Sequence, residues 1–333
     1  FFFFFFFGLK NSRVLGWRNW ILQLLGFTRP GKPPSSRRLM LQSAVPTMPV
    51  KGLQSPAIGS TDDEPWVWSQ IKAEARRDAD SEPALASFLF STVLSHPSFP
   101  RSLSFHLGNK LASPTLLPSL LYEIFFSAFS SDAAIRSAAI ADLRAARHRD
   151  PACSAFSHCL LNSKGFLSVQ TQRVTHRLWA HSRRPLALAI HARTTDVFAV
   201  DIHPAAVIGR GVLLDHATGV VIGETAVVGD NVSILHNVTL GGTGKESGDR
   251  HPKIGDGVLI GAGATVLGNV RVGEGAKIGA GSVVLTEVPP WTTAVGIPAK
   301  LLGGKDQPTM HEDMPGESMD HTSFISEWSD YII

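Results

Sequence analysis

The sequence predicts an α + β fold in which an all-α helical domain precedes a parallel β-helix, with a flexible tail at the C-terminus. Three observations predict this order. Apolar residues recur at helical spacing in the first part, at a period of six in the second, and without a period at the end. The chain of 333 residues is long enough for both parts. The predicted divisions are a basic leader at 1–60, the helical domain at 61–195, the β-helix at 196–304 and the tail at 305–333.

The leader contains Lys and Arg but neither Asp nor Glu, and it is rich in Ser, Pro and Gly. This composition is typical of an organelle transit peptide. The start of seven phenylalanines without a Met is also typical of a translated non-coding stretch, in which case the protein would begin at Met40 or Met48. Both interpretations stay open. No apolar run in the leader approaches the ~18 residues that span a membrane, so we expect no membrane partner.

The helical domain is expected to begin at a capping box, "TDDE" at Thr61–Glu64, because such a pair satisfies the first backbone N–H groups of a helix. Helical periodicity then recurs between Pro and Gly breaks. It covers "PWVWSQIKAEARR", "TLLPSLLYEIFFSAF", "AAIRSAAIADLRAAR", "GFLSVQTQRVTHRLWAHS" and "LALAIHART". We expect Cys153 and Cys159 to be reduced thiols, because the only two cysteines of the chain offer neither a disulfide framework nor CxxC zinc spacing.

The β-helix is predicted from aliphatic anchors that recur every six residues, so that three rungs would form one coil. Gly often follows the anchor, and a small or β-branched residue lies four positions after it. The repeat is interrupted by a two-residue insertion after the third anchor and by the longer segment "GGTGKESGDRHPK". The anchors are Ile202, Ile208, Leu214, Ile222, Val228, Ile234, Leu240, Ile254, Ile260, Val266, Val272, Ile278 and Val284.

Asp215 and His216 directly follow the anchor Leu214. Since the anchor points inward, we expect both side chains at an outward-facing corner of the coil. The register places His236 roughly one strand spacing, ~4.8 Å, from His216. Two neighbouring imidazoles beside a Gly-rich loop predict a site that handles protons. For His216 considered alone, a solvated corner histidine is the alternative.

Three segments resemble one family, the serine acetyltransferases. They are "VDIHPAAVIGRGVLLDHATGVVIGETAVVGDNVSILHNVTLGGTGKESGDRHPKIGDG", "RDPACSAFSHCLLNSKGF" and "FISEWSDYII", the last of which is similar to the plant enzymes. The resemblance runs from about residue 64 to the C-terminus. It implies a left-handed coil and the transfer of the acetyl group of acetyl-CoA to the hydroxyl of L-serine, giving O-acetyl-L-serine for cysteine synthesis.

The resemblance also implies roles for individual residues. His216 would be the general base, a task for which a neutral imidazole is well suited, and Asp201 would fix its tautomer. Backbone N–H groups of Gly241 to Gly244 would meet the oxyanion. The remaining contacts would be Arg250 and His251 to the serine carboxylate, Asp150 and Asp215 to its ammonium group, and Gly242, Ala262 and Ala280 to acetyl-CoA. Acetyl-CoA would be a co-substrate, and no metal is expected. Taken alone, Arg250 is more typical of a solvated loop charge, and Asp150 is more typical of a residue at a helix end or in a turn.

Assembly and partners are implied in the same way. The family predicts a homotrimer or a dimer of trimers, with the active site between adjacent β-helices. Tyr331, Ile332 and Ile333 at the C-terminus would bind O-acetylserine (thiol)lyase and form a cysteine synthase complex. The part after the leader is most similar to cytosolic plant forms, so we expect a cytosolic enzyme, or a plastid or mitochondrial one if residues 1–60 are a transit peptide.

Other classes of function stay open as alternatives. The net charge of only +3 argues against a nucleic-acid partner. Another hexapeptide acyltransferase, acting on a sugar or a xenobiotic, would share the coil. A γ-class carbonic anhydrase would bind zinc through three histidines, but it requires an H-x4-H pair that does not occur among His216, His236 and His251. A scaffold without catalysis would be expected only if His216 or Asp201 were missing.

Overall fold

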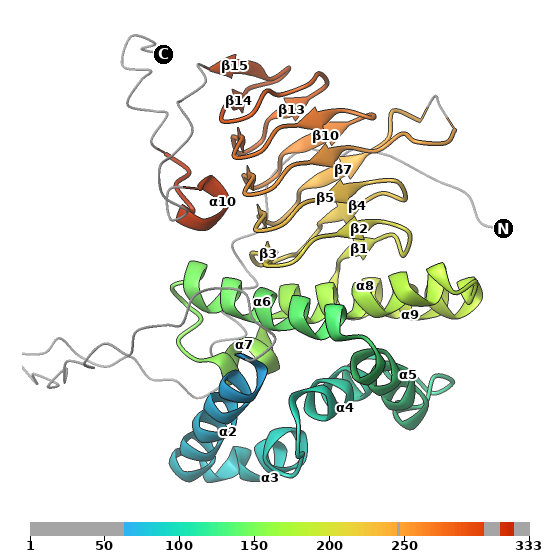
Figure 1. The fold of residues 1–333 in the computed structure, drawn as a ribbon, viewed down its shortest axis with the longest axis vertical. Helices are drawn as coiled ribbons and strands as arrows, with labels where there is room; N and C mark the ends of the chain where they lie inside the picture. The colour runs from blue at the N-terminus through green and yellow to red at the C-terminus, as the bar shows by residue number, and fades with distance from the viewer. Residues whose placement is uncertain (1–62, 245–246, 303–313, 323–333) are drawn as a thin grey trace, which may run out of the picture. The chain divides into compact units, whose positions relative to one another are not determined.

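The structure, a computed structural model, describes residues 63–244, 247–302 and 314–322. The leader at 1–60 and Thr61 of the predicted capping box lie outside these ranges. Helices occupy the first part and end at Phe198 (Figure 1). They are α2 (Asp63–Ser81), η1 (Pro83–Leu85), α3 (Ala86–Leu89), η2 (Phe90–Leu94), α4 (Phe99–Leu111), α5 (Pro118–Ser131), α6 (Ala133–Arg149), α7 (Phe156–Asn162), α8 (Lys164–Ala180) and α9 (Arg184–Phe198). Within the described ranges, none of the helices combines the length and the apolar character that a membrane crossing requires.

Parallel strands follow from Asp201 onward and form three sheets, one on each face of the coil (Figure 1). All strand pairs in the sheets are parallel except β14 with β15. Sheet A contains β1 (Asp201–Ile202), β4 (Val221–Ile222), β7 (Thr239–Gly241), β10 (Thr265–Leu267) and β13 (Val283–Val284); sheet B contains β2 (Val207–Ile208), β5 (Val227–Val228), β8 (Lys253–Ile254) and β11 (Arg271–Val272); sheet C contains β3 (Leu213–Leu214), β6 (Ser233–Ile234), β9 (Leu259–Ile260), β12 (Lys277–Ile278), β14 (Thr293–Val295) and β15 (Lys300–Leu302).

The strand register confirms the two predicted insertions. Ile202 pairs with Ile222, across the two-residue insertion, and Ile234 pairs with Ile260, across the longer one. The anchors therefore stay stacked, and the inserted residues leave the coil at its corners. Every anchor is buried except Ile208, which is partly buried and packs against the core. The small or β-branched positions four residues after an anchor, such as Ala226 and Val258, are fully buried as well.

The helical part supports the first coil of the β-helix. Figure 1 shows α6, α8 and α9 lying beneath β1–β3, and contacts join α6 and α8 to β3 and α9 to β1. Arg149, at the end of α6, donates from Nη1 to the carbonyl oxygen of Gly211 at 2.9 Å and to Ser233 Oγ at 3.2 Å. In α8, Gly165 allows a close approach, because a Cβ there would collide with the carbonyl oxygen of Leu214. These contacts hold the end of α6 against the corner between β2 and β3, and the start of α8 against the end of β3, which leads into the corner that carries His216.

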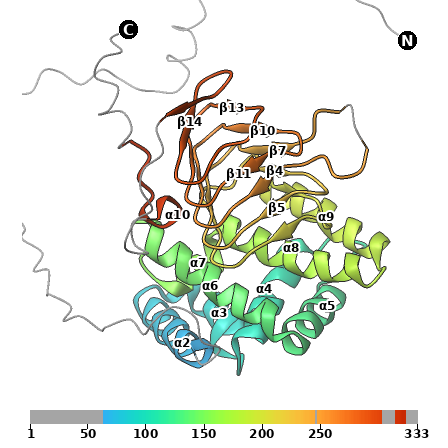
Figure 2. The same cartoon turned by 45° about the horizontal axis from the view of Figure 1, so that its top comes forward.

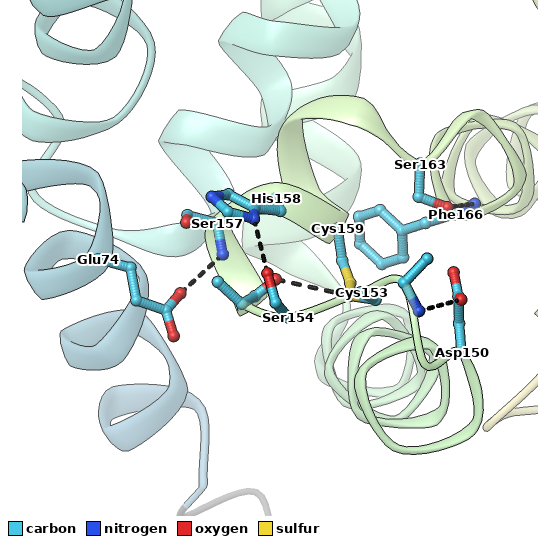
Figure 3. The surroundings of a disulfide bond; sticks show 11 residues. Glu74, Asp150, Cys153, Ser154, Ser157, His158, Cys159, Ser163 and Phe166 are labelled. Carbon is cyan, nitrogen blue, oxygen red and sulfur yellow. Dashed lines mark hydrogen bonds between the residues drawn. A yellow bond between two sulfur atoms is a disulfide. The ribbon is translucent and has the colours of Figure 1, made fainter. Parts of the chain in front are cut away.

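The prediction of free thiols is wrong, because Cys153 and Cys159 form a disulfide with Cα atoms 6.0 Å apart (Figure 3). Cys153 lies in the loop before α7 rather than on a helix, so the chain folds back and brings the two buried sulfurs together. The backbone N–H of Ser157, in the first turn of α7, also donates to Glu74 in α2 at 2.8 Å. The loop after Asp150 is thereby anchored to its neighbouring helix.

The prediction of a flexible tail is wrong for residues 314–322. This segment contains α10 (Pro315–Ser318) and packs against α6 and β9 (Figures 1 and 2). The carbonyl oxygen of Gly316 accepts a hydrogen bond from Ser233 Oγ at 2.5 Å, and Asp320 pairs with Lys277 at 3.0 Å. Burial of Met314 and these polar contacts attach a segment that has no sequence period of its own.

His106 in α4 is a buried histidine whose protonation opposes folding. Its side chain is 4% exposed, and Nε2 lies 3.0 Å from the carbonyl oxygen of Leu161, to which it donates. Burial lowers the pKa of His106 from 6.5 to about 4. The unfolded chain therefore takes up the proton first. The contribution of the neutral His106 ring to the free energy of unfolding is therefore fully present above pH 6.5. It falls as the pH drops toward about 4, and the full loss amounts to about 3 kcal/mol.

We expect His106→Gln to flatten this dependence, because an amide can donate to Leu161 but does not titrate in this range. The free energy of urea unfolding should fall less between pH 6.5 and about 4 in the variant than in the parent. His181→Gln, at the exposed C-terminal cap of α8, is the matched control and should keep the parental dependence. An identical dependence in His106→Gln and the parent would contradict the assignment.

Candidate active site

His216 lies at the corner where β3 turns into β4. His216 and the next residue, Ala217, both have positive φ, at 54° and 59°, a conformation that L-residues rarely adopt. Two short backbone hydrogen bonds close this corner, from Ala217 N–H to the Asp215 oxygen at 2.6 Å and from Thr218 N–H to the His216 oxygen at 2.7 Å. The two-residue insertion thus forms a strained turn, a feature that clusters at functional sites. It leaves the His216 side chain 73% exposed.

The structure brings His236 beside His216, as the register predicts. The ring centroids are 5.7 Å apart, and the rings meet edge to face rather than stacked. Asp215 is the nearest carboxylate that His216 has in the described part of the chain, with 3.8 Å between Nε2 and Oδ1, which is too long for a hydrogen bond. His236 Nδ1 is buried and has no hydrogen-bond partner among the described residues.

The predicted residues at corners of the β-helix lie along two edges, on either side of sheet A. The C–A edge consists of the corners that lead from sheet C into sheet A, at 215–220, 235–238, 261–264 and 279–282. The A–B edge consists of the corners that lead from sheet A into sheet B, with described residues at 203–206, 223–226, 242–244, 247–252 and 268–270. His216 lies on the first edge, and Arg250 and His251 lie on the second.

Ala262 and Ala280 occupy the C–A edge above the histidines. Backbone hydrogen bonds join the successive corners, from Gly263 N–H to His236 at 2.9 Å and from Gly281 N–H to Ala262 at 2.8 Å. Ala262 is half-buried and Ala280 is exposed, so small side chains leave the backbone accessible on the same edge as His216 and His236. Gly242 lies instead at the A–B edge, where a Cβ would contact the Arg250 side chain.

Asp201 makes a different contact from the one that the resemblance implies. It is the first residue of β1, and its Oδ1 lies 2.9 Å from Nε2 of His191 in α9. Among the described residues this is the side-chain partner of Asp201, and His216 is not paired with it. Sequence reasoning missed His191, because nothing in the helical repeat of "LALAIHART" distinguishes a hydrogen-bond partner of Asp201 from a surface histidine.

Arg250 is oriented on the A–B edge by a carboxylate from another coil. Its Nη2 donates to Glu224 Oε2 at 2.8 Å, and its backbone N–H donates to Thr225 Oγ1 at 3.0 Å. The hydrogen bond from Arg250 lowers the pKa of Glu224, which therefore stays ionised. Sequence reasoning missed Glu224. The signal that could have indicated it is its position at a corner of the coil, in "VIGETAV". Arg250 is thus not the freely solvated loop charge of the alternative interpretation.

His251 is held beside Arg250 as a neutral ring. Its Nδ1 accepts from the backbone N–H of Thr225 at 3.2 Å, so the ring proton is on Nε2. Burial, and then the charge of Arg250, lower the pKa of His251. Gly223 makes room for the ring, because a Cβ at that position would collide with Nε2. His251 can therefore donate a hydrogen bond to an anion beside a guanidinium.

Asp150 ends α6, and its Oδ1 accepts from the backbone N–H of Ala152 at 2.8 Å (Figure 3). The described contacts of this side chain are those of a helix-end residue, the alternative that the sequence left open. The neighbouring Arg149 ties it to the β-helix, while the disulfide restrains the loop that follows. A contact between Asp150 and a substrate stays a prediction.

Together the two edges offer complementary chemistry. An exposed imidazole on a strained corner can remove a proton, and accessible backbone follows it along the C–A edge. On the A–B edge, an oriented guanidinium and a neutral imidazole suit a carboxylate. No cluster of three metal-ligating side chains occurs within residues 63–244, 247–302 and 314–322.

Comparison with known proteins points to one family. Residues 67–171 match the family described as serine acetyltransferase, N-terminal, and residues 251–286 match bacterial transferase hexapeptide (six repeats). The chain is 74% identical over 268 residues to serine acetyltransferase 5 of Arabidopsis thaliana, covering 80% of this chain and 86% of that protein. It is 68% identical over 306 residues to probable serine acetyltransferase 5 of Oryza sativa subsp. japonica, covering 92% and 87%.

A solved structure agrees with these relatives. Soybean serine acetyltransferase complexed with serine is 74% identical, with a TM-score of 0.72, and the match covers 73% of this chain and 100% of that chain. These similarities confirm the predicted fold, a helical N-terminal part followed by the left-handed parallel β-helix of hexapeptide transferases.

Proposed function

Because the chain belongs to the serine acetyltransferase family and is an acyltransferase, we propose that it transfers acetyl from acetyl-CoA to the hydroxyl of L-serine. The products are O-acetyl-L-serine, a precursor for cysteine synthesis, and coenzyme A. The observation that carries the proposal is the placement of an exposed His216 and an oriented Arg250 on the two edges that flank sheet A. A base and a carboxylate-binding group are what an amino acid with a nucleophilic hydroxyl requires.

The proposed reaction is a direct attack. His216 removes the proton as the serine oxygen attacks the thioester carbonyl, and Asp201 stabilises the imidazolium that forms. The tetrahedral oxyanion accepts hydrogen bonds from backbone N–H groups of Gly241 to Gly244, and its collapse expels the CoA thiolate. Residues of the chain supply the base and the oxyanion donors, so the proposed reaction includes no metal cofactor.

Serine and acetyl-CoA are bound by residues of the two edges and by Asp150 at the end of α6. Arg250 and His251 contact the serine carboxylate, and Asp150 and Asp215 contact its ammonium group. Acetyl-CoA, a co-substrate, lies along the C–A edge against Ala262 and Ala280. Gly242 contributes its backbone where the loop "GGTGK" leaves sheet A.

The test is release of coenzyme A from acetyl-CoA, followed with a thiol reagent in the presence of L-serine. We expect release that depends on L-serine and an O-acetylserine product in mass spectrometry. An amino sugar serves as the alternative acceptor, because another hexapeptide acyltransferase is the competing function. Release with the sugar but not with L-serine would refute the proposal.

We further propose that the active site is completed between subunits of a trimer. Groups for the hydroxyl and for the carboxylate lie on different edges of one β-helix, and neighbouring copies in a trimer can bring opposite edges together. A dimer of trimers, joined through the helical parts, is the larger assembly that we propose. Sedimentation analysis distinguishes the two.

The C-terminal residues Tyr331, Ile332 and Ile333 lie outside the described residues, and we propose that they bind O-acetylserine (thiol)lyase. Deletion of Ile333 is expected to abolish co-purification with the lyase while leaving serine acetylation within about twofold of the parent, because a terminal anchor supplies most of such a contact. Substitution of Ser329, four residues earlier, by Ala is the matched control. Retained binding without Ile333 would contradict the anchor.

We propose a cytosolic location, with plastid or mitochondrion as the alternative. Related enzymes of Arabidopsis thaliana described as chloroplastic and mitochondrial are 54% and 55% identical, so the family serves several compartments. N-terminal sequencing of the natural protein distinguishes these locations, since removal of residues 1–60 as a transit peptide would leave a start near residue 61, whereas translation from Met40 or Met48 would leave a start at or just after that residue.

A further inference from the structure

We infer that His191 is a positioning residue for the reaction: it holds one oxygen of Asp201 and leaves the other for the base His216. This inference rests on the proposed function, in which Asp201 orients His216. It is carried by the contact between Nε2 of His191 and Oδ1 of Asp201, at 2.9 Å. A carboxylate only accepts hydrogen bonds, so the ring N–H of His191 is the donor.

The backbone connects this pair directly to the corner of His216. Helix α9 ends at Phe198, Ala199 adopts the left-handed conformation with φ 55°, and β1 begins at Asp201. The carbonyl oxygen of Ala199 accepts from Gly219 N–H at 2.8 Å, and Asp201 N–H donates to Val220 at 2.9 Å. Gly219 and Val220 belong to the same corner, 215–220, as His216. The backbone of Asp201 is therefore held against the corner that carries His216.

The side chain of Asp201 needs a further contact to keep one orientation. It is 51% exposed, so solvent competes for its oxygens, and it follows the C-terminal end of α9, where the helix dipole disfavours a negative charge. His191 is only 19% exposed. A donor from within α9 offsets the unfavourable dipole and restricts the carboxylate.

The ring of His191 has the ring of His203 as a neighbour. His203 lies 6.4 Å from it, and Trp179 of α8 packs edge-on against His203 at 5.0 Å. The His203 Nδ1 accepts from the backbone N–H of Ala205 at 3.0 Å, which orients that ring. His191 thus transmits the packing of α8 and α9 to Asp201.

A carboxylate can accept at both oxygens, and His191 occupies one of them. Among the described residues, no other side chain hydrogen-bonds Asp201. The second oxygen is therefore available to an imidazole that turns toward it from the corner 215–220. In this arrangement His191 does not compete with His216, because each ring uses its own oxygen.

The test compares His191→Phe, which keeps a ring but removes the donor, with His191→Gln, whose amide can still donate. We expect His191→Phe to lower kcat for serine acetylation roughly tenfold, with KM for L-serine and acetyl-CoA within about twofold. His191→Gln should retain most of the parental kcat. His181→Phe, the same change on an exposed ring in the cap of α8, should leave kcat unchanged.

A double-mutant cycle separates positioning from a general structural role. If His191 acts through Asp201, the variant carrying both His191→Phe and Asp201→Asn should have the kcat of Asp201→Asn alone. Multiplied losses in the double variant, an unchanged kcat in His191→Phe, or an equal loss in His191→Gln would each overturn the inference.

Thermal unfolding monitors whether the variants fold, and His191→Leu replaces His191→Phe if the larger ring is not accommodated. A parent without serine-dependent acetyl transfer would refute the proposed function itself, whereas an active parent with an insensitive His191 would refute only this inference.

Discussion

Substitution of His216 by Ala is expected to lower kcat for serine acetylation by roughly 100- to 10,000-fold, the range that general-base catalysis contributes. Serine has a weakly nucleophilic hydroxyl, and no attack proceeds efficiently unless its proton is removed. The exposed ring is suited to this task, since 73% of the side chain is open to a substrate. Steady-state assays with saturating L-serine and acetyl-CoA measure the loss.

The change should act on chemistry rather than on folding. His216 makes no side-chain hydrogen bond within the described residues, and its backbone turn is closed by main-chain groups. The oligomeric state should therefore match the parent and thermal unfolding should stay close to it, with a small loss because Ala adopts the positive φ of 54° less readily than His. His181→Ala is the matched control at an exposed site. Near-parental turnover in His216→Ala would exclude the general-base role.

Substitution of Arg250 by Ala is expected to raise KM for L-serine roughly 10- to 100-fold, because a charged hydrogen bond to the substrate carboxylate is lost. KM for acetyl-CoA should change little, since acetyl-CoA is proposed to bind on the C–A edge. The enzyme should remain folded, because the pair of Arg250 with Glu224 is partly exposed and such pairs contribute little to stability. Initial rates over a range of L-serine concentrations measure the effect.

Arg210→Ala is the matched control for this charge removal. Arg210 also pairs with a carboxylate, Asp230 at 3.3 Å, but it follows β2, away from the two edges that flank sheet A. It should leave both KM values unchanged. A parental KM for L-serine in Arg250→Ala would exclude Arg250 from the serine site.

The two variants together also test the shared site. If subunits combine opposite edges, co-expression of His216→Ala and Arg250→Ala chains should yield mixed trimers with one intact site, and activity should recover above that of either variant at low L-serine. Absence of recovery in verified mixed trimers would place each site within one subunit. This experiment uses the complete chain in its assembled form.

Much of the fold could be predicted because the repeat is a local property. Each anchor, such as Leu214 or Ile234, must reach the core of its own rung, so a period of six specifies the coil without knowledge of distant contacts. The insertion at Asp215 and His216 could be placed at a corner for the same reason. The tail segment 314–322 could not be predicted, because its contacts with Ser233 and Lys277 depend on surfaces that exist only after the coil has formed.

The candidate site divides in the same way. The sequence by itself determined which residues are candidates for the chemistry and on which rung those of the β-helix lie, because motif and period are both read along the chain. Only the tertiary structure decided their partners. Asp201 pairs with His191 rather than with His216, and Arg250 pairs with Glu224. Cys153 forms a disulfide with Cys159. Such pairings depend on how a helix packs on a coil, how successive coils stack and how a loop folds back. These are distances between segments, and no local pattern of residues encodes them.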